Sequence, residues 1–111
     1  MDAEKVLGVL DVYDKKLEQY SRNCSAIKPE RADPTKKYFT SSEEGWAKMS
    51  HVWWAIGQCR IFVAAGRMEK AFRWLGFIQG AFWFNGTYSV EELANHNKPA
   101  GEETNLDPSR R

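Results

Sequence analysis

Apolar side chains recur at helical spacing along most of this chain. Within residues 2–22 the apolar positions step by four and three residues, which places them on one seam of a helix. Five residues form this stripe: Val6, Leu10, Tyr13, Leu17 and Tyr20. Asp2 and Glu4 lie in the first turn, where the helix dipole favours negative charge. This segment is therefore predicted to be an amphipathic helix.

Residues 23–40 are predicted to form a connector. Pro29 and Pro34 interrupt any helix within a polar stretch. Tyr38 and Phe39 are expected to dock the connector onto the rest of the molecule. Such a long connection is uncommon in a compact domain, so we expect it to be functional or mobile.

A second helix is predicted between Ser41 and Gly66. Ser41 and Glu44 have the spacing of a capping box, and Gly66 is a typical stop residue. The apolar stripe of this helix contains Trp46, Met49, Val52, Trp53, Ile56, Cys59 and Val63. Gly57 interrupts the helix at a cost of about 1 kcal/mol relative to Ala. We expect another backbone to approach closely there.

A third helix is predicted from about Arg67 to Asn85, and it carries two apolar sectors. The main stripe is Met68, Ala71, Phe72, Leu75, Ile78 and Phe82. The second sector is Trp74, Phe77, Ala81 and Phe84, and Lys70 and Arg73 share it. A helix that is apolar nearly all round is buried on more than one side. Because the chain is small, we expect a second subunit, a partner or the docked connector from Pro29 to Phe39 to cover the second sector.

The last segment begins with a second capping box, Ser89 to Glu92. It predicts a short helix over residues 90–96, which Pro99 terminates. Residues 100–111 lack periodicity and are expected to be a disordered tail. The sequence as a whole predicts an all-α fold: a small helical bundle of three main helices and a short C-terminal helix, forming one domain over residues 1–99.

Charge and apolar run lengths exclude several classes of function. The 111 residues carry a net charge of only +1, which gives no global field for nucleic acid or an anionic membrane. The apolar run from Trp74 to Phe84 is shorter than the roughly 20 residues that span a bilayer. The N-terminus lacks the pattern of a signal peptide, so we expect reduced thiols at Cys24 and Cys59 and a cytoplasmic protein.

No catalytic or cofactor motif is present. His51 and Cys59 are eight residues apart on one predicted helix, about 12 Å at 1.5 Å per residue, which is too far to share a metal ion. Helix capping explains the carboxylate pairs that begin the second and fourth helices. The sequence therefore predicts no enzyme, no cofactor and no metal.

Aromatic residues are unusually frequent, at 14% of the chain with five Trp. Trp and Tyr are favoured at interfaces, although a bulky core has the same composition. The candidate binding residues are those of the second sector and its cations: Lys70, Arg73, Trp74, Phe77 and Phe84. The aromatic members are the expected anchors, and the two cations form the rim.

Residues 66–80, together with residues 88–93 and 96–99, resemble small uncharacterised proteins of tailed bacteriophages. The resemblance covers the C-terminal half and carries no known activity. It implies a phage origin and a host bacterial cytoplasm. Two hypotheses follow. In the first, the chain binds and modulates a host macromolecule, such as a defence-system component, through the aromatic face. In the second, a homo-oligomer sequesters a nucleotide-like ligand between its subunits.

Overall fold

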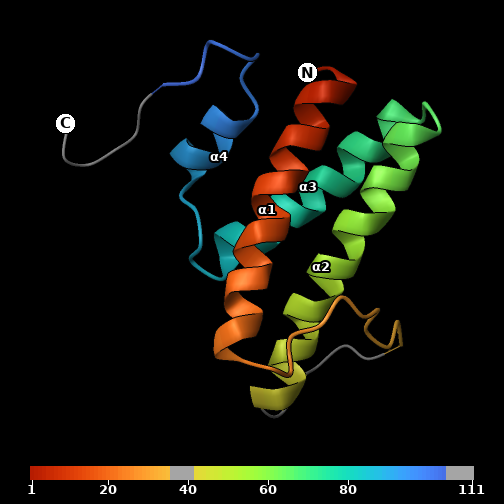
Figure 1. Ribbon diagram of the computed structural model, residues 1–111, viewed down its shortest axis with the longest axis vertical. Coiled ribbons are helices and arrows are strands. Elements are labelled where there is room, and N and C mark those ends of the chain that lie inside the picture. The colour runs from red at the N-terminus through yellow and green to blue at the C-terminus, as the bar shows by residue number, and fades with distance from the viewer. Residues whose placement is uncertain (36–41, 105–111) are drawn as a thin grey trace.

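The computed structural model describes residues 1–35 and 42–104, except for the side chains of residues 42–45. Within this part the chain forms helices and no strand. They are α1 (Ala3–Asn23), α2 (Ser42–Ala64), α3 (Met68–Phe84) and α4 (Val90–His96). In Figure 1, α1 and α2 run side by side, α3 crosses behind them, and α4 lies on the other side of α1 from α2. The predicted all-α bundle is confirmed.

Local sequence signals account for the ends of the helices. Asp2 caps α1, since its carboxylate accepts a hydrogen bond from the backbone N–H of Lys5 at 2.8 Å. Gly66 ends α2 in a left-handed conformation with φ of 73°, which glycine adopts without strain. Ser89 and Glu92 form the predicted capping box of α4. The proposed cap at Ser41 lies outside the described residues.

One continuous hydrophobic core joins all four helices. Its buried members are Val6, Val9, Leu10, Tyr13, Leu17, Val52, Ala55, Ile56, Cys59, Val63, Ala71, Leu75, Ile78, Phe82 and Leu93. Most predicted stripe positions are therefore buried or packed against the core. Trp46 and Phe72 are the exceptions, at 38% and 40% exposed. The first turns of α2 extend past α3, so α3 does not cover that end of α2 (Figure 1). Phe72 lies at the edge of its stripe, about 120° around α3 from the buried Ile78.

The expected close approach at Gly57 is wrong. Gly57 is exposed, and a Cβ added there would meet no atom within 4 Å. The glycine therefore has no packing role in α2. Burial of Val52, Ala55, Ile56 and Cys59 on the opposite face stabilises the helix despite it.

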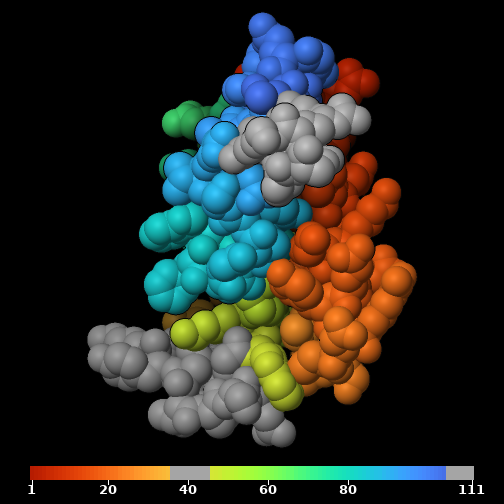
Figure 2. Space-filling model, turned by 90° about the vertical axis from the view of Figure 1, so that its left-hand side faces the viewer, coloured from red at the N-terminus to blue at the C-terminus, as the bar shows by residue number. Residues whose placement is uncertain are grey.

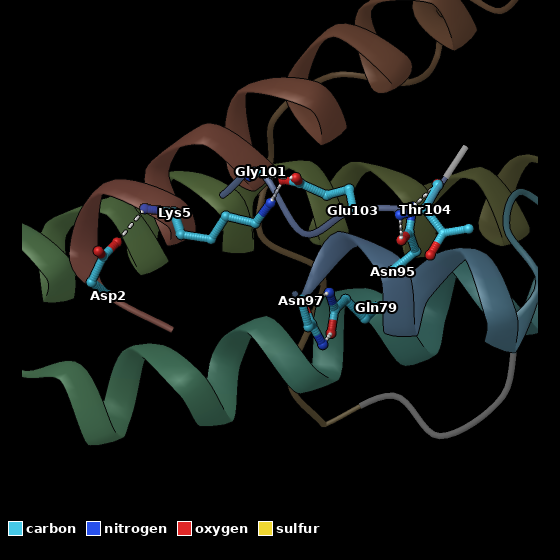
Figure 3. Close-up of polar contacts among 8 residues, drawn as sticks. All are labelled: Asp2, Lys5, Gln79, Asn95, Asn97, Gly101, Glu103 and Thr104. Carbon is cyan, nitrogen blue, oxygen red and sulfur yellow. Dashed lines mark hydrogen bonds and ion pairs between the residues drawn. The ribbon is translucent and has the colours of Figure 1, made fainter. Parts of the chain in front are cut away.

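Polar contacts hold the helices in register. Between α1 and α2, Arg60 forms an ion pair with Asp11 at 2.7 Å, and the indole N–H of Trp53 donates to Asp14 at 2.6 Å. Between α3 and the residue after α4, the side-chain amide of Gln79 is paired reciprocally with the amide of Asn97, at 2.7 and 3.1 Å (Figure 3).

Residues 97–104 return along α4 towards the start of α1. Figure 2 shows α4 and this segment covering the side of the molecule beside α1. The side chain of Asn95 is hydrogen-bonded to the backbone N–H and carbonyl of Thr104, and Glu103 forms an ion pair with Lys5 (Figure 3). The sequence predicts a disordered tail from Ala100, whereas residues 100–104 are anchored by side chains that periodicity does not detect. Residues 105–111 lie outside the described part.

Candidate functional site

The predicted site residues lie along a groove between α2, α3 and the connector. It has two adjoining hollows. The first has a volume of about 520 Å³ and is lined by His51, Lys70, Arg73, Trp74 and Phe77. The second, of about 580 Å³, is lined by Ala32, Asp33, Pro34, Lys48, His51, Val52, Phe77, Gly80, Ala81 and Phe84. His51 and Phe77 belong to both, so we treat the two hollows as one α2–α3 groove.

Aromatic rings from α2 and α3 build the wall of the first hollow. The Trp74 ring lies 5.8 Å from that of Trp54 and 5.2 Å from that of Phe62. The His51 ring contacts Trp54 at 5.1 Å and meets Phe77 edge-on at 6.0 Å. Tilted and edge-to-face pairs at these distances are favourable, so the wall is held firmly in place.

Cations surround the aromatic wall. The ammonium of Lys70 lies 4.5 Å from the centre of the Phe62 ring, and the guanidinium of Arg31 lies 5.6 Å from that of Trp54. Arg73 is exposed, and within the described residues it has no acidic partner. Its guanidinium is therefore available for an anionic group of a ligand.

The connector closes one side of the groove. Its residue Ile27 is buried, and the backbone N–H of Lys28 donates to the hydroxyl of Ser50 at 3.0 Å. The N–H of Ala32 donates to Nδ1 of His51 at 3.1 Å. These contacts fix the described part of the connector along α2. Tyr38 and Phe39, which are predicted to dock it, lie outside the described residues.

His51 has a role that the sequence did not reveal. Its Nδ1 accepts a hydrogen bond, so the neutral ring carries its proton on Nε2. Burial and then the positive charge of Arg31 lower the pKa of His51 below its ordinary value. The ring is therefore neutral at neutral pH and links the connector to the groove. From the sequence we expect an ordinary surface histidine at this position, and no residue spacing predicts its contact with Ala32.

Four of the five predicted site residues surround the first hollow, and Phe84 lies at the far end of the second. Their exposure differs: Phe77 is 54% exposed and Phe84 84% exposed, while Trp74 is half-buried against Trp54 and Phe62. Trp74 is therefore part of the wall, and Phe77 is the more accessible apolar surface. Part of the second sector on α3 is thus covered from within the chain, by α2 and the connector.

The remaining reactive groups have structural surroundings. Cys59 is buried and its thiol donates to the carbonyl of Ala71 at 3.3 Å, and burial raises the pKa of this thiol to about 11. Among the described residues, no group of three His, Cys, Asp or Glu side chains is placed to hold a metal ion. In the same part of the chain, none of the helices has both the length and the apolar character needed to cross a membrane.

Comparison with known proteins found no match to this chain among family models, curated proteins or solved structures.

Proposed function

We propose that the chain is a non-enzymatic binding protein that holds a segment of a host protein in the α2–α3 groove and thereby inhibits or modulates that protein. The sequence resemblance alone suggests a phage origin and a bacterial cytoplasm as the place of action. A defence-system component is the class of partner that such an origin suggests.

The length of the groove carries the proposal. Its lining runs along α3 from Lys70 to Phe84, about 21 Å at 1.5 Å per residue. An extended peptide of about six residues covers that distance at 3.3 Å per residue. A compact small molecule would leave much of the groove empty, whereas a segment of a protein fills it.

The distribution of charge suggests which segment fits. Lys70 and Arg73 lie at one end, and the second hollow is mainly apolar around Phe77, Ala81 and Phe84. We therefore expect an acidic side chain of the partner beside Arg73 and one or two apolar side chains along Phe77 and Phe84. Charge-assisted hydrogen bonds to a guanidinium fix orientation, and burial of apolar surface supplies affinity.

The test begins with affinity capture from the host, followed by direct titration of the captured protein. Phe77→Ala removes the accessible ring of the groove, and Arg73→Glu reverses its free charge. Ile61→Ala is a matched control, because Ile61 is 56% exposed on α2 and does not line the groove. We expect Phe77→Ala and Arg73→Glu each to weaken binding at least about tenfold, which corresponds to about 1.4 kcal/mol. Equal affinities for all variants would overturn the proposal.

The first hollow alone favours a second candidate, a nucleotide-like ligand. Its volume of about 520 Å³ is within the usual range of small-molecule sites, and it combines Lys70 and Arg73 with the ring of Trp74. Such a set accepts a phosphate and stacks a base. Thermal unfolding with linear and cyclic nucleotides tests this candidate. A ligand at 100-fold excess over its Kd adds about 2.7 kcal/mol, and no change in melting temperature with any nucleotide would exclude it.

A further inference from the structure

The outer face of α3, opposite the core, carries exposed apolar side chains among the described residues. Three aromatic residues are exposed on this face: Phe72 at 40%, Trp83 at 53% and Phe84 at 84%. Arg73 is exposed beside them, and the exposed Gly76 and Gly80 form a flat strip between them. Several exposed aromatic rings on one helix are typical of an interaction surface.

The residues of this face are arranged symmetrically about the level of Ile78. Phe72 lies as far before Ile78 in the sequence as Phe84 lies after it. In the same way, Arg73 lies as far before Ile78 as Trp83 lies after it. Gly76 and Gly80 are likewise equidistant from it. At about 100° per residue, Phe72 and Trp83 lie on one side of the glycine strip, and Arg73 and Phe84 lie on the other. Reversal of the helix direction therefore exchanges Phe72 with Phe84 and Gly76 with Gly80, and it exchanges Arg73 with Trp83.

From this arrangement we infer that a second copy of the chain packs its α3 antiparallel on this face, around a two-fold axis at the level of Ile78. A two-fold interface requires one patch that is complementary to itself. In this pairing Phe72 meets the partner's Trp83, and Arg73 lies over the ring of the partner's Phe84. Each of these contacts occurs twice, as an aromatic pair and as a cation–π pair.

The two glycines permit the close contact that the pairing needs. A Cβ added at Gly76 or Gly80 would meet no atom within 4 Å, so the strip faces open space. Without side chains there, two helix backbones approach until the flanking rings interdigitate. Neither glycine has a positive φ, and no described atom would contact a Cβ at either position, so packing within the described part of the chain does not require them.

Charge favours the antiparallel direction. A parallel pair would place the two Arg73 side chains at the same end, next to two positive helix N-termini, and Arg73 has no acidic partner within the described residues. The antiparallel pair separates the two arginines and aligns the helix dipoles favourably.

The exposed rings supply most of the area that an interface needs. At about 200 Å² for a whole aromatic residue, the exposed parts of Phe72, Trp83 and Phe84 amount to about 350 Å² per copy. Two copies would cover about 700 Å² with these rings alone, and specific interfaces bury about 1,000 Å² or more. The remaining area comes from the side chains of Arg73 and Glu69 and from the glycine strip.

This pairing goes beyond the proposed function and does not depend on it. Arg73 and Phe84 line the α2–α3 groove and also border the outer face of α3. The second copy and a ligand of the groove would therefore compete for Arg73 and Phe84, whereas Lys70, Trp74 and Phe77 would stay accessible to the ligand. The oligomeric state is measured without a ligand, so failure of the pairing and failure of the groove as a binding site are distinguishable.

The mass of the full chain in solution, from light scattering at tens of micromolar, gives the first test. We expect twice the mass of one chain. Gly80→Leu places a bulky side chain in the strip and should give the mass of one chain. Gly57→Leu is the matched control, since Gly57 is also exposed, helical and free of neighbours, and it should stay dimeric. Helical circular dichroism verifies that both variants fold. A monomeric wild type, or a Gly80→Leu variant that remains dimeric, would overturn the inference.

Disulfide formation tests the direction of the pair. In a Cys24→Ser background, Gly76→Cys and Gly80→Cys are prepared separately, mixed and oxidised. The antiparallel pairing predicts links between position 76 of one copy and position 80 of the other, and therefore more cross-linking in the mixture than in either variant alone. Links only between identical positions would indicate a parallel pair and contradict the inference.

Discussion

The hydroxyl of Tyr13 on α1 lies 2.8 Å from Nδ1 of His96 on α4, and it also accepts a hydrogen bond of 3.0 Å from the side-chain amide of Gln79 on α3. Tyr13 is fully buried. Burial strongly raises the pKa of its hydroxyl, which stays protonated and donates to His96. One phenol therefore joins α1, α3 and α4.

Replacement of Tyr13 by Phe should destabilise the fold. The ring remains, but Gln79 and His96 each lose a hydrogen-bond partner in a buried place, which costs about 1–3 kcal/mol. Urea unfolding followed by circular dichroism measures the loss. Tyr20→Phe is the control: Tyr20 is only half-buried, and its hydroxyl contacts Thr87 at 2.5 Å, so the expected cost is below about 1 kcal/mol. A Tyr13→Phe variant as stable as the wild type would show that the network contributes nothing.

The stability of the fold should fall as the pH is lowered from 7.5 to 5. Burial lowers the pKa of both His51 and His96 below 6.5 in the folded chain. As the pH falls, the unfolded chain therefore binds protons before the folded chain does. The stability present above pH 6.5 is lost as the pH falls through the folded-state pKa values of the two histidines. His51→Gln removes one of these groups and should reduce the dependence. NMR titration checks the direction, and a pKa for His51 above 6.5 would contradict it.

Truncation of Phe77 should leave the fold intact. Phe77 is 54% exposed, whereas the neighbouring Leu75 is 3% exposed. Phe77→Ala should therefore cost less than about 1.5 kcal/mol, and Leu75→Ala about 2–5 kcal/mol. Thermal unfolding of the two variants compares them. If Phe77→Ala is the more damaging change, Phe77 belongs to the core and is unsuitable as a groove residue.

The two thiols should differ in reactivity. Cys24 is half-buried at the end of α1, while Cys59 is buried, hydrogen-bonded and has its pKa raised to about 11. Because the thiolate is the reactive form, a thiol reagent at pH 8 should modify Cys24 rapidly and Cys59 only when the chain opens. Mass spectrometry of the labelled chain gives the order. Rapid modification of Cys59 in the native protein would contradict the packing of α2 against α3.

The sequence predicted the helices well because their signals are local. The stripe on α1, Gly66 at the end of α2 and the capping box at Ser89 all act within a few residues, and the structure contains each of them. The angular positions of residues around α3 also distinguished the core side from a second apolar sector. Residues of this sector line the groove.

The sequence did not predict contacts that depend on the path of the chain. His51 acquires its role only because the connector returns along α2 and presents the N–H of Ala32. Trp74 lies on the predicted sector, yet it is half-buried because Trp54 and Phe62 of α2 face it. Residues 100–104 lack periodicity, but Lys5 and Asn95 anchor them.

We propose that the α2–α3 groove binds a segment of a host protein. Calorimetric titration of the captured host protein into the wild type, Phe77→Ala and Ile61→Ala tests this claim most directly. We expect a Kd at least about tenfold higher for Phe77→Ala and an unchanged Kd for Ile61→Ala. Identical Kd values for all three proteins would contradict it.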